Sequence, residues 1–213
     1  MAREGRRARI GLLGGSFNPA HDGHRHISLL AIDRLGLDRV WWLVSPQNPL
    51  KPVAGMAPLA QRLARARQVA RHPRLVVSDL ERELGTQYTI DTLLALRRRL
   101  PKVAFVWLMG ADNLVDIDQW RRWPVLFNTV PVAIFDRPTY SLKALTSSAA
   151  RRFARFRVCG GLDALADRVP PAWAFVRARL HAGSATRIRR GGDWPPSGTE
   201  PEDRAPPQQR RVT

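Results

Sequence analysis

One stretch near the N-terminus decides the fold: Gly14-Gly15-Ser16-Phe17-Asn18-Pro19-Ala20-His21-Asp22-Gly23-His24. It is preceded by an apolar run, residues 9–13, which predicts a buried strand. It leads into residues 24–36, a predicted helix with one apolar face made of Ile27, Ala31 and Leu35. A glycine-rich turn from a strand into a helix is typical of α/β proteins, which bind ligands at the carboxyl ends of their strands.

Strand-like runs and helical patterns continue to alternate along the chain. Strands are predicted over residues 9–13, 40–44, 75–77, 103–109, 130–135 and 173–180. Helices are predicted over residues 24–36, 58–71, 89–100 and 142–156, with a last one from Arg187 onward. This order implies right-handed crossovers, and therefore an α/β fold with a doubly wound, mostly parallel, Rossmann-like sheet and helices on both faces.

Length and composition predict one domain, residues 1–190, followed by a Pro-rich disordered tail over 191–213. The 44% hydrophobic and 25% charged residues are typical of a soluble globular protein. No apolar run approaches the roughly 20 residues of a membrane span, so no membrane partner is expected. A single cysteine, Cys159, fits a reducing compartment, and we expect a cytoplasmic protein. A homo-oligomer stays open.

The net charge of +17 favours anionic partners, which include nucleic acids, membrane surfaces and phosphorylated metabolites. Residues 190–213 hold four basic and four acidic residues, so the excess lies in the first 189. No aromatic-and-basic RNA motif accompanies the charge, and no nucleic acid is expected as a partner. A solvated basic surface is the simpler interpretation.

The chemistry of the glycine–histidine segment points to a phosphate. Gly14 and Gly15 let backbone amides approach a phosphate closely, because no Cβ intervenes. The N-terminus of the following helix adds partial positive charge at the same place. His21 and His24 are three residues apart and can reach phosphate oxygens together.

Three other readings of this segment fail on spacing. The glycines do not form Gly-x-Gly-x-x-Gly, which disfavours a dinucleotide oxidoreductase. Gly-x-x-x-x-Gly-Lys-Ser/Thr does not occur in the sequence, which disfavours a P-loop kinase or ATPase. His21, His24 and His26 lack a matching Cys, Asp or Glu cluster, so no metal-ligating residues are predicted.

The segment resembles the Gly-x-Phe-Asp/Asn-Pro-x-His-x-Gly-His signature of the nucleotidyltransferase α/β superfamily. More narrowly, the chain resembles bacterial nicotinate-nucleotide adenylyltransferases over about residues 10–190. Four further motifs follow in the order of that family: residues 46–51 (Pro-Gln-Asn-Pro-Leu-Lys), 88–93 (Tyr-Thr-Ile-Asp-Thr-Leu), 110–113 (Gly-Ala-Asp-Asn) with Trp120, and 184–189 (Ser-Ala-Thr-Arg-Ile-Arg).

The resemblance implies transfer of AMP from ATP to nicotinate mononucleotide, which yields deamido-NAD and pyrophosphate in NAD biosynthesis. The substrate phosphate would attack the ATP α-phosphorus in line. Because that nucleophile is already an anion, catalysis needs positioning and charge neutralisation rather than a general base. ATP and nicotinate mononucleotide are the expected partners, and Mg²⁺, held chiefly by the ATP phosphates, is the expected cofactor.

The resemblance assigns catalysis to His21 and His24, which would bind the triphosphate and stabilise the transition state. Asp112 follows a predicted strand and would accept hydrogen bonds from the ribose. The hydroxyls of Ser184 and Thr186 suit the β- and γ-phosphates. The full set implied for ATP binding is Gly14, Gly15, Ser16, Phe17, Asp112, Ser184, Thr186 and Arg189.

The acceptor side is implied to use Asn18, Lys51, Thr89 and Trp120. Thr89 opens a helix, so its amide and hydroxyl would meet the pyridine carboxylate, and Trp120 would stack on the cationic ring. Lys51 supplies a mobile cation near the phosphates. Two rivals remain: adenylyl transfer to nicotinamide mononucleotide or phosphopantetheine, and a basic nucleic-acid-binding protein without catalysis. Packing is predicted for Trp41, Trp42, Trp107, Trp123 and Trp173.

Overall fold

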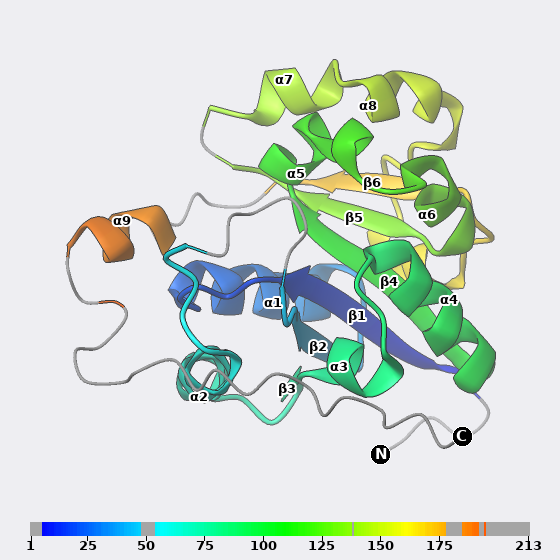
Figure 1. Ribbon diagram of the computed structural model, residues 1–213. Coiled ribbons are helices and arrows are strands. Elements are labelled where there is room, and N and C mark those ends of the chain that lie inside the picture. The colour runs from blue at the N-terminus through cyan, green and yellow to red at the C-terminus, as the bar shows by residue number, and fades with distance from the viewer. Residues whose placement is uncertain (1–5, 48–53, 138, 178–184, 192–193, 195–213) are drawn as a thin grey trace, which may run out of the picture.

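One parallel sheet runs through the part of the chain that the computed structural model describes, residues 6–47, 54–137, 139–177, 185–191 and 194 (Figure 1). Its strands follow the order β3-β2-β1-β4-β5-β6, and each neighbouring pair is parallel. This arrangement confirms the predicted doubly wound α/β sheet. The strands are β1 (Ala8–Gly15), β2 (Arg39–Val44), β3 (Leu75–Ser78), β4 (Val103–Gly110), β5 (Val132–Phe135) and β6 (Trp173–Val176).

Helices connect the strands and cover the sheet. The α-helices are α1 (Asp22–Arg34), α2 (Leu59–Ala70), α3 (Leu80–Leu84), α4 (Thr89–Arg99), α5 (Ala111–Val115), α6 (Trp123–Thr129), α7 (Ser141–Leu145), α8 (Ser148–Arg152) and α9 (Ala185–Arg190). Short 3-10 helices are η1 (Ile117–Gln119), η2 (Ala154–Phe156) and η3 (Leu162–Asp167). Strand β1 and helices α1, α2 and α4 lie where the sequence pattern indicated, within two residues at each end.

The predictions differ from the structure in the second half of the chain. Residues 142–156 form three short helices rather than one, because the Ser147 side chain starts α8 by accepting the amide of Ala150 at 3.3 Å. Strand β6 ends at Val176, where its pairing with the four residues of β5 ends, and residues 178–180 of the predicted strand lie outside the described residues. Helices α3, α5 and α6 were not predicted, because five to seven residues show too little periodicity.

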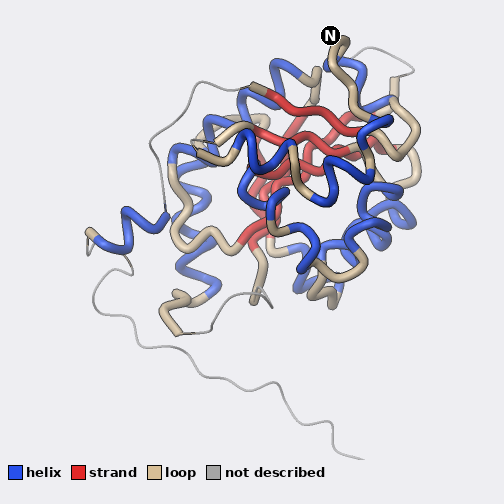
Figure 2. Tube along the Cα trace, turned by 90° about the horizontal axis from the view of Figure 1, so that it is seen from above, coloured by secondary structure: helices blue, strands red, loops and turns tan. Residues whose placement is uncertain are grey.

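Two apolar clusters cover the two faces of the sheet, with helices on either side of the strands (Figure 2). On one face α1, α2 and η3 pack against side chains such as Leu13 and Trp42. On the other, α4, α5, α6 and α8 pack against Leu12 and Phe105. Because successive strand residues point to opposite faces, Leu12 and Leu13 belong to different clusters. The predicted helices on both faces are confirmed.

The strand order reverses between β1 and β4, which lie side by side at the centre of the sheet (Figure 1). From there β2 and β3 extend to one side, and β5 and β6 to the other. Such a reversal is where ligands bind, outside the carboxyl ends of the strands. Here β1 ends at Gly15 and β4 ends at Gly110, so the glycine–histidine segment and the 110–113 motif meet at one edge.

The tryptophans predicted to pack do so. Trp42, Trp107 and Trp173 are fully buried, and Trp41 and Trp123 are partly buried against the α4 face. Trp194 is also buried, although it falls within the range predicted as a disordered tail. Residues 195–213 of that range lie outside the described residues. Within the described residues, no helix combines the length and apolarity that a membrane crossing requires.

Candidate active site

The histidine loop, which we define as residues 16–24, turns the chain from β1 into α1. His21 is the N-cap of α1, and its Nδ1 accepts the backbone amide of Gly23 at 3.1 Å. His24, in the first turn, accepts the amide of His21 through its own Nδ1 at 3.2 Å. This reciprocal capping satisfies amides that a helix start leaves without intrahelical partners. The ring centroids of the two histidines are 3.9 Å apart.

Capping through Nδ1 fixes the proton of each imidazole. A ring nitrogen that accepts a hydrogen bond carries no hydrogen, so the neutral ring bears its proton on Nε2. Nε2 is then a hydrogen-bond donor in both His21 and His24. Two donors this close together suit an anionic group with several oxygens, such as a phosphate.

The ring of Phe17 supports the histidines from within the protein. Its backbone has a φ of +47°, which is unfavourable for a bulky residue, and its side chain is buried. The ring stacks on Trp42 with centroids 5.1 Å apart and lies 4.8 Å from the ring of His24. Phe17 was predicted for ATP binding. Its side chain is used here to hold His24 in place.

Gly14 and Gly15 differ in what surrounds them. A Cβ on Gly14 would lie 2.4 Å from the Trp107 ring, so this position requires glycine for packing inside the protein. A Cβ on Gly15 would meet nothing closer than the Phe17 ring at 3.7 Å, an ordinary contact. Packing therefore explains Gly14, whereas the protein leaves room at Gly15. Close approach of a ligand to the backbone stays a prediction for Gly15.

Arg62 on α2 binds the histidine loop from inside the protein. The sequence pattern did not lead us to predict this role. Its guanidinium is buried and donates to four backbone carbonyls at 2.7–2.8 Å: those of Ser16, Ser45, Pro46 and Ala57. Burial lowers the pKa of Arg62 to about 10, well above neutral pH, so the group stays charged. A signal was present in the sequence, because Arg62 occupies the same helix face as Leu59, Leu63 and Ala66.

Asn18, predicted on the acceptor side, is a junction between three chain segments. Its Nδ2 donates to the carbonyl of Gly55 at 2.8 Å. Its Oδ1 accepts the amide of Ala57 at 3.2 Å and the indole Nε1 of Trp194 at 2.6 Å. Its backbone carbonyl accepts from Arg189 at 2.5 Å. The side chain of Asn18 thus has a clear structural role, and direct contact with a substrate stays a prediction.

The C-terminal motif lies against the histidine loop despite its distance in sequence. Arg189, on α9, reaches the carbonyl of Asn18, and its other terminal nitrogen lies 3.3 Å from the Thr186 hydroxyl. Thr186 and Arg189 are both exposed, which leaves their side chains accessible to a ligand. Ser184, predicted beside them, lies outside the described residues.

Asp112 stands at the end of β4, in the first turn of α5. Its Oδ2 forms an ion pair with Arg137 at 3.0 Å. Its Oδ1 is buried and has no hydrogen-bond partner within the described residues. A Cβ on Gly110 would lie 2.3 Å from that oxygen, so glycine is needed to seat Asp112. The ion pair with Arg137 orients this carboxylate, and its contact with a ribose hydroxyl stays a prediction.

Thr89 and Trp120, predicted for the acceptor, come from neighbouring segments. The guanidinium of Arg121 lies 4.6 Å from the Tyr88 ring centroid, which brings the residues next to Thr89 and Trp120 together. Thr89 is the first residue of α4 and is half-buried. Trp120 is half-buried too, and its ring meets that of Trp107 edge-on, 6.4 Å between centroids. Lys51, the fourth predicted acceptor residue, lies outside the described residues.

Glu81 on α3 is a buried carboxyl that the sequence did not single out. The side chains of Ser45 and Thr92 form hydrogen bonds with it, while its Oε2 has no partner within the described residues. Burial raises the pKa of Glu81 to about 7, against a smaller lowering by these two hydrogen bonds. Glu81 therefore changes its charge near neutral pH, next to the end of β2.

No protein cluster for a metal ion is found within residues 6–47, 54–137, 139–177, 185–191 and 194. There, no three His, Cys, Asp or Glu side chains come close enough together to hold one. Asp112 has an unused buried oxygen, but no second carboxylate joins it. The donor set thus fits a metal bound mainly by a ligand's own oxygens, and Mg²⁺ stays a prediction.

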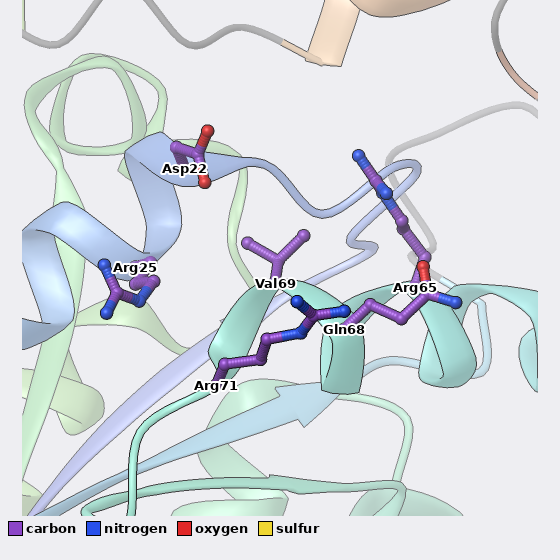
Figure 3. Close-up of a pocket in the computed structure, with 6 residues that line it drawn as sticks. All are labelled: Asp22, Arg25, Arg65, Gln68, Val69 and Arg71. Atoms are coloured by element: carbon purple, nitrogen blue, oxygen red, sulfur yellow. The ribbon is translucent and has the colours of Figure 1, made fainter.

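A shallow pocket of about 390 Å³ lies beside the histidine loop, between α1 and α2 (Figure 3). Its lining residues are Asp22, Arg25, Arg65, Gln68, Val69 and Arg71. In Figure 3 the three guanidinium groups point in different directions rather than toward one point. A built anion site would gather them around one ligand, so this pocket is a basic surface hollow and not a second active site.

Comparisons with known proteins agree with this geometry. A family model described as cytidylyltransferase-like matches residues 12–191. The chain is 56% identical over 185 residues to a Cereibacter sphaeroides protein named "Probable nicotinate-nucleotide adenylyltransferase", covering 87% of this chain and 98% of that one. A Parvibaculum lavamentivorans protein of the same name is 52% identical over 187 residues, covering 87% and 93%.

Solved structures share the fold at low sequence identity. The chain matches Plasmodium falciparum nicotinic acid mononucleotide adenylyltransferase complexed with NaAD, with a TM-score of 0.66 and 15% identity. The match covers 86% of this chain and 83% of that one. The same Plasmodium protein complexed with APC gives a TM-score of 0.64 at 14% identity.

Proposed function

We propose that this chain, which belongs to the cytidylyltransferase-like family and within it to the nicotinate-nucleotide adenylyltransferases, transfers AMP from ATP to nicotinate mononucleotide. The products are deamido-NAD and pyrophosphate, and the reaction serves NAD biosynthesis. One observation carries the proposal: His21 and His24 lie at the start of α1, where the strand order reverses, with their ring centroids 3.9 Å apart. The Plasmodium complexes with NaAD and APC support nucleotide ligands for this fold.

The reaction is an in-line displacement at the ATP α-phosphorus. An oxygen of the acceptor phosphate forms the new P–O bond as the bond to pyrophosphate breaks. The attacking oxygen is already negative, so no proton has to be removed. Catalysis comes from N–H donors fixed where charge gathers on the phosphoryl oxygens, which are Nε2 of His21 and His24 and the amides of Gly15 and Ser16.

The far end of the chain binds the rest of ATP. Thr186 and Arg189, held beside Asn18, bind the β- and γ-phosphates together with Ser184. Asp112 orients the ribose through its carboxylate, which the ion pair with Arg137 keeps in place. Mg²⁺, when bound to the phosphates, supplies further neutralisation of their charge.

The acceptor nucleotide is recognised through its pyridine ring. Thr89 meets the ring carboxylate with its amide and hydroxyl at the start of α4. Trp120 stacks on the cationic ring, supported edge-on by Trp107. Lys51 contributes a cation near the acceptor phosphate. A carboxylate suits an amide donor better than a neutral carboxamide does, which favours nicotinate over nicotinamide.

A substrate comparison tests the proposal. Purified protein with ATP and Mg²⁺ is incubated separately with nicotinate mononucleotide, nicotinamide mononucleotide and phosphopantetheine, and pyrophosphate release is measured. We expect the highest kcat/KM with nicotinate mononucleotide. Release with phosphopantetheine and none with nicotinate mononucleotide would overturn the acceptor. A steep salt-dependent shift with RNA, without turnover on any substrate, would instead support the nucleic-acid-binding alternative.

A further inference from the structure

Trp194 lies beyond residues 12–191, the part of the chain that the family model matches. Its side chain is nevertheless 8% exposed, and its indole Nε1 donates to Oδ1 of Asn18 at 2.6 Å. A buried tryptophan in a Pro-rich terminal region, bonded to the histidine loop, has no place in the functions assigned above. The contact therefore asks for an explanation of its own.

The bond from Trp194 completes the hydrogen bonding of Asn18. An amide oxygen has two lone pairs, and Oδ1 of Asn18 uses one for Ala57 and one for Trp194. On the same residue, the backbone carbonyl accepts from Arg189. The C-terminal segment, which we define as residues 185–191 together with Trp194, thus bonds to Asn18 twice, through Arg189 and through Trp194. The helix that carries Thr186 and Arg189 is fastened at both its own arginine and the tryptophan that follows.

Helix α9 packs only loosely against α2. A pocket of about 540 Å³ separates it from α2, lined by Pro19, Gln61, Ala64, Arg65, Gln68, Ile188 and Trp194. Helix α9 has six residues, too few to be stable without tertiary contacts. Its position in Figure 1, outside the layers that cover the sheet, agrees with this. The polar bonds to Asn18 therefore act together with the burial of Trp194 in placing the segment.

We propose that Trp194 is a positioning residue for the ATP side of the active site. Its hydrogen bond to Asn18 holds the segment that carries Thr186 and Arg189 against the histidine loop, so that both halves meet the same triphosphate. The identity of that ligand rests on the proposed function, whereas the docking of the segment does not. The single N–H of its indole is already donated to Asn18, so its role is to position that segment.

Trp194→Phe in the full chain tests this role, because it removes the indole N–H and keeps an aromatic ring. Loss of one hydrogen bond of this kind corresponds to about a fivefold weaker docking equilibrium. We expect KM for ATP to rise by at most about fivefold, because ATP binding is weakened only by the docked population that is lost, with kcat and KM for nicotinate mononucleotide changing less than about twofold. In protein without ATP, amide hydrogen exchange of residues 185–191 should become faster by a similar factor.

Trp173→Phe is the matched control. It also removes a buried indole N–H bond, from Trp173 to the carbonyl of Phe153 at 2.8 Å, but on β6. This variant should lower Tm without changing KM for ATP or the exchange of residues 185–191. If Trp194→Phe leaves both KM for ATP and the exchange of residues 185–191 unchanged, the positioning role is wrong. It is also wrong if Trp173→Phe changes these two quantities as much as Trp194→Phe does. If the wild-type protein has no adenylyltransferase activity, the proposed function fails, and faster exchange in Trp194→Phe still supports docking.

Discussion

The histidine loop and the C-terminal segment serve one proposed site but are held in opposite ways. The loop rests on the core: Arg62 binds its underside and the Phe17 ring packs on Trp42. The C-terminal segment borders a pocket, and both Arg189 and Trp194 bond to the loop at Asn18. Arg62 and its four carbonyls form a buried, hydrogen-bonded network, which is rigid, whereas α9 is a six-residue helix beside a pocket, and such elements open at a lower cost in free energy. One half of the site is therefore built in advance, and the other half docks onto it.

The largest loss of activity should follow from replacing a histidine of the histidine loop. His24→Ala removes one of two fixed donors and should lower kcat about a thousandfold. The fold should survive, because α1 keeps its N-cap residue His21. Steady-state kinetics and far-UV circular dichroism check the two claims. His26→Ala, in the same helix, is the control, and wild-type turnover in His24→Ala would remove that histidine from the mechanism.

Arg62→Met should damage the support of the rigid half. Four carbonyls lose their donor at once, and we expect a loss of about 4 kcal/mol in the free energy of unfolding. Urea unfolding measures it. Arg65→Met is the matched control: Arg65 is exposed on the same helix, and its replacement should change stability by less than about 0.5 kcal/mol. Equal losses in the two variants would contradict the role of Arg62.

The raised pKa of Glu81 predicts that the stability of the protein depends on pH. Its pKa of about 7 when folded exceeds the 4.5 of an unperturbed glutamate, so the unfolded chain releases its proton first. Stability should therefore fall as pH rises from about 4.5 to about 7, by an amount on the order of 3 kcal/mol. Glu81→Gln should abolish this decrease and be more stable than wild type at pH 8. Glu83→Gln, exposed on the same helix, should keep the wild-type profile, and unfolding at several pH values distinguishes the two.

The two neighbouring glycines give the smallest and finest test. Gly14→Ala places a methyl group 2.4 Å from the Trp107 ring and should lower the free energy of unfolding by about 2 kcal/mol. Gly15→Ala meets no such obstacle, so stability should change by less than about 0.5 kcal/mol while KM for ATP rises. Urea midpoints and KM values for both variants check this division. Similar stability losses would mean that packing explains both glycines.

Several of these features could be predicted from local pattern, and others could not. The first strand and helix were predictable because the change from a buried apolar run to a 3.6-residue period occurs within one short stretch. For Arg62 only burial was predictable, because a charged residue on an apolar helix face indicates burial but not its hydrogen-bond partners. The carbonyls that it binds come from residues 16, 45, 46 and 57, and only the folded chain brings them together.

The sequence by itself determined the doubly wound fold and the order of its motifs, since both follow from short-range periodicity and spacing. It also indicated which residue types suit a phosphate, and that role stays a prediction. The tertiary structure decided how the two histidines are held: Nδ1 of each ring accepts a backbone amide. It also decided that the Trp107 ring leaves no room for a side chain at Gly14, and that Trp194 donates a hydrogen bond to Asn18. These contacts join residues up to 176 positions apart, and no local pattern encodes a pairing of that range.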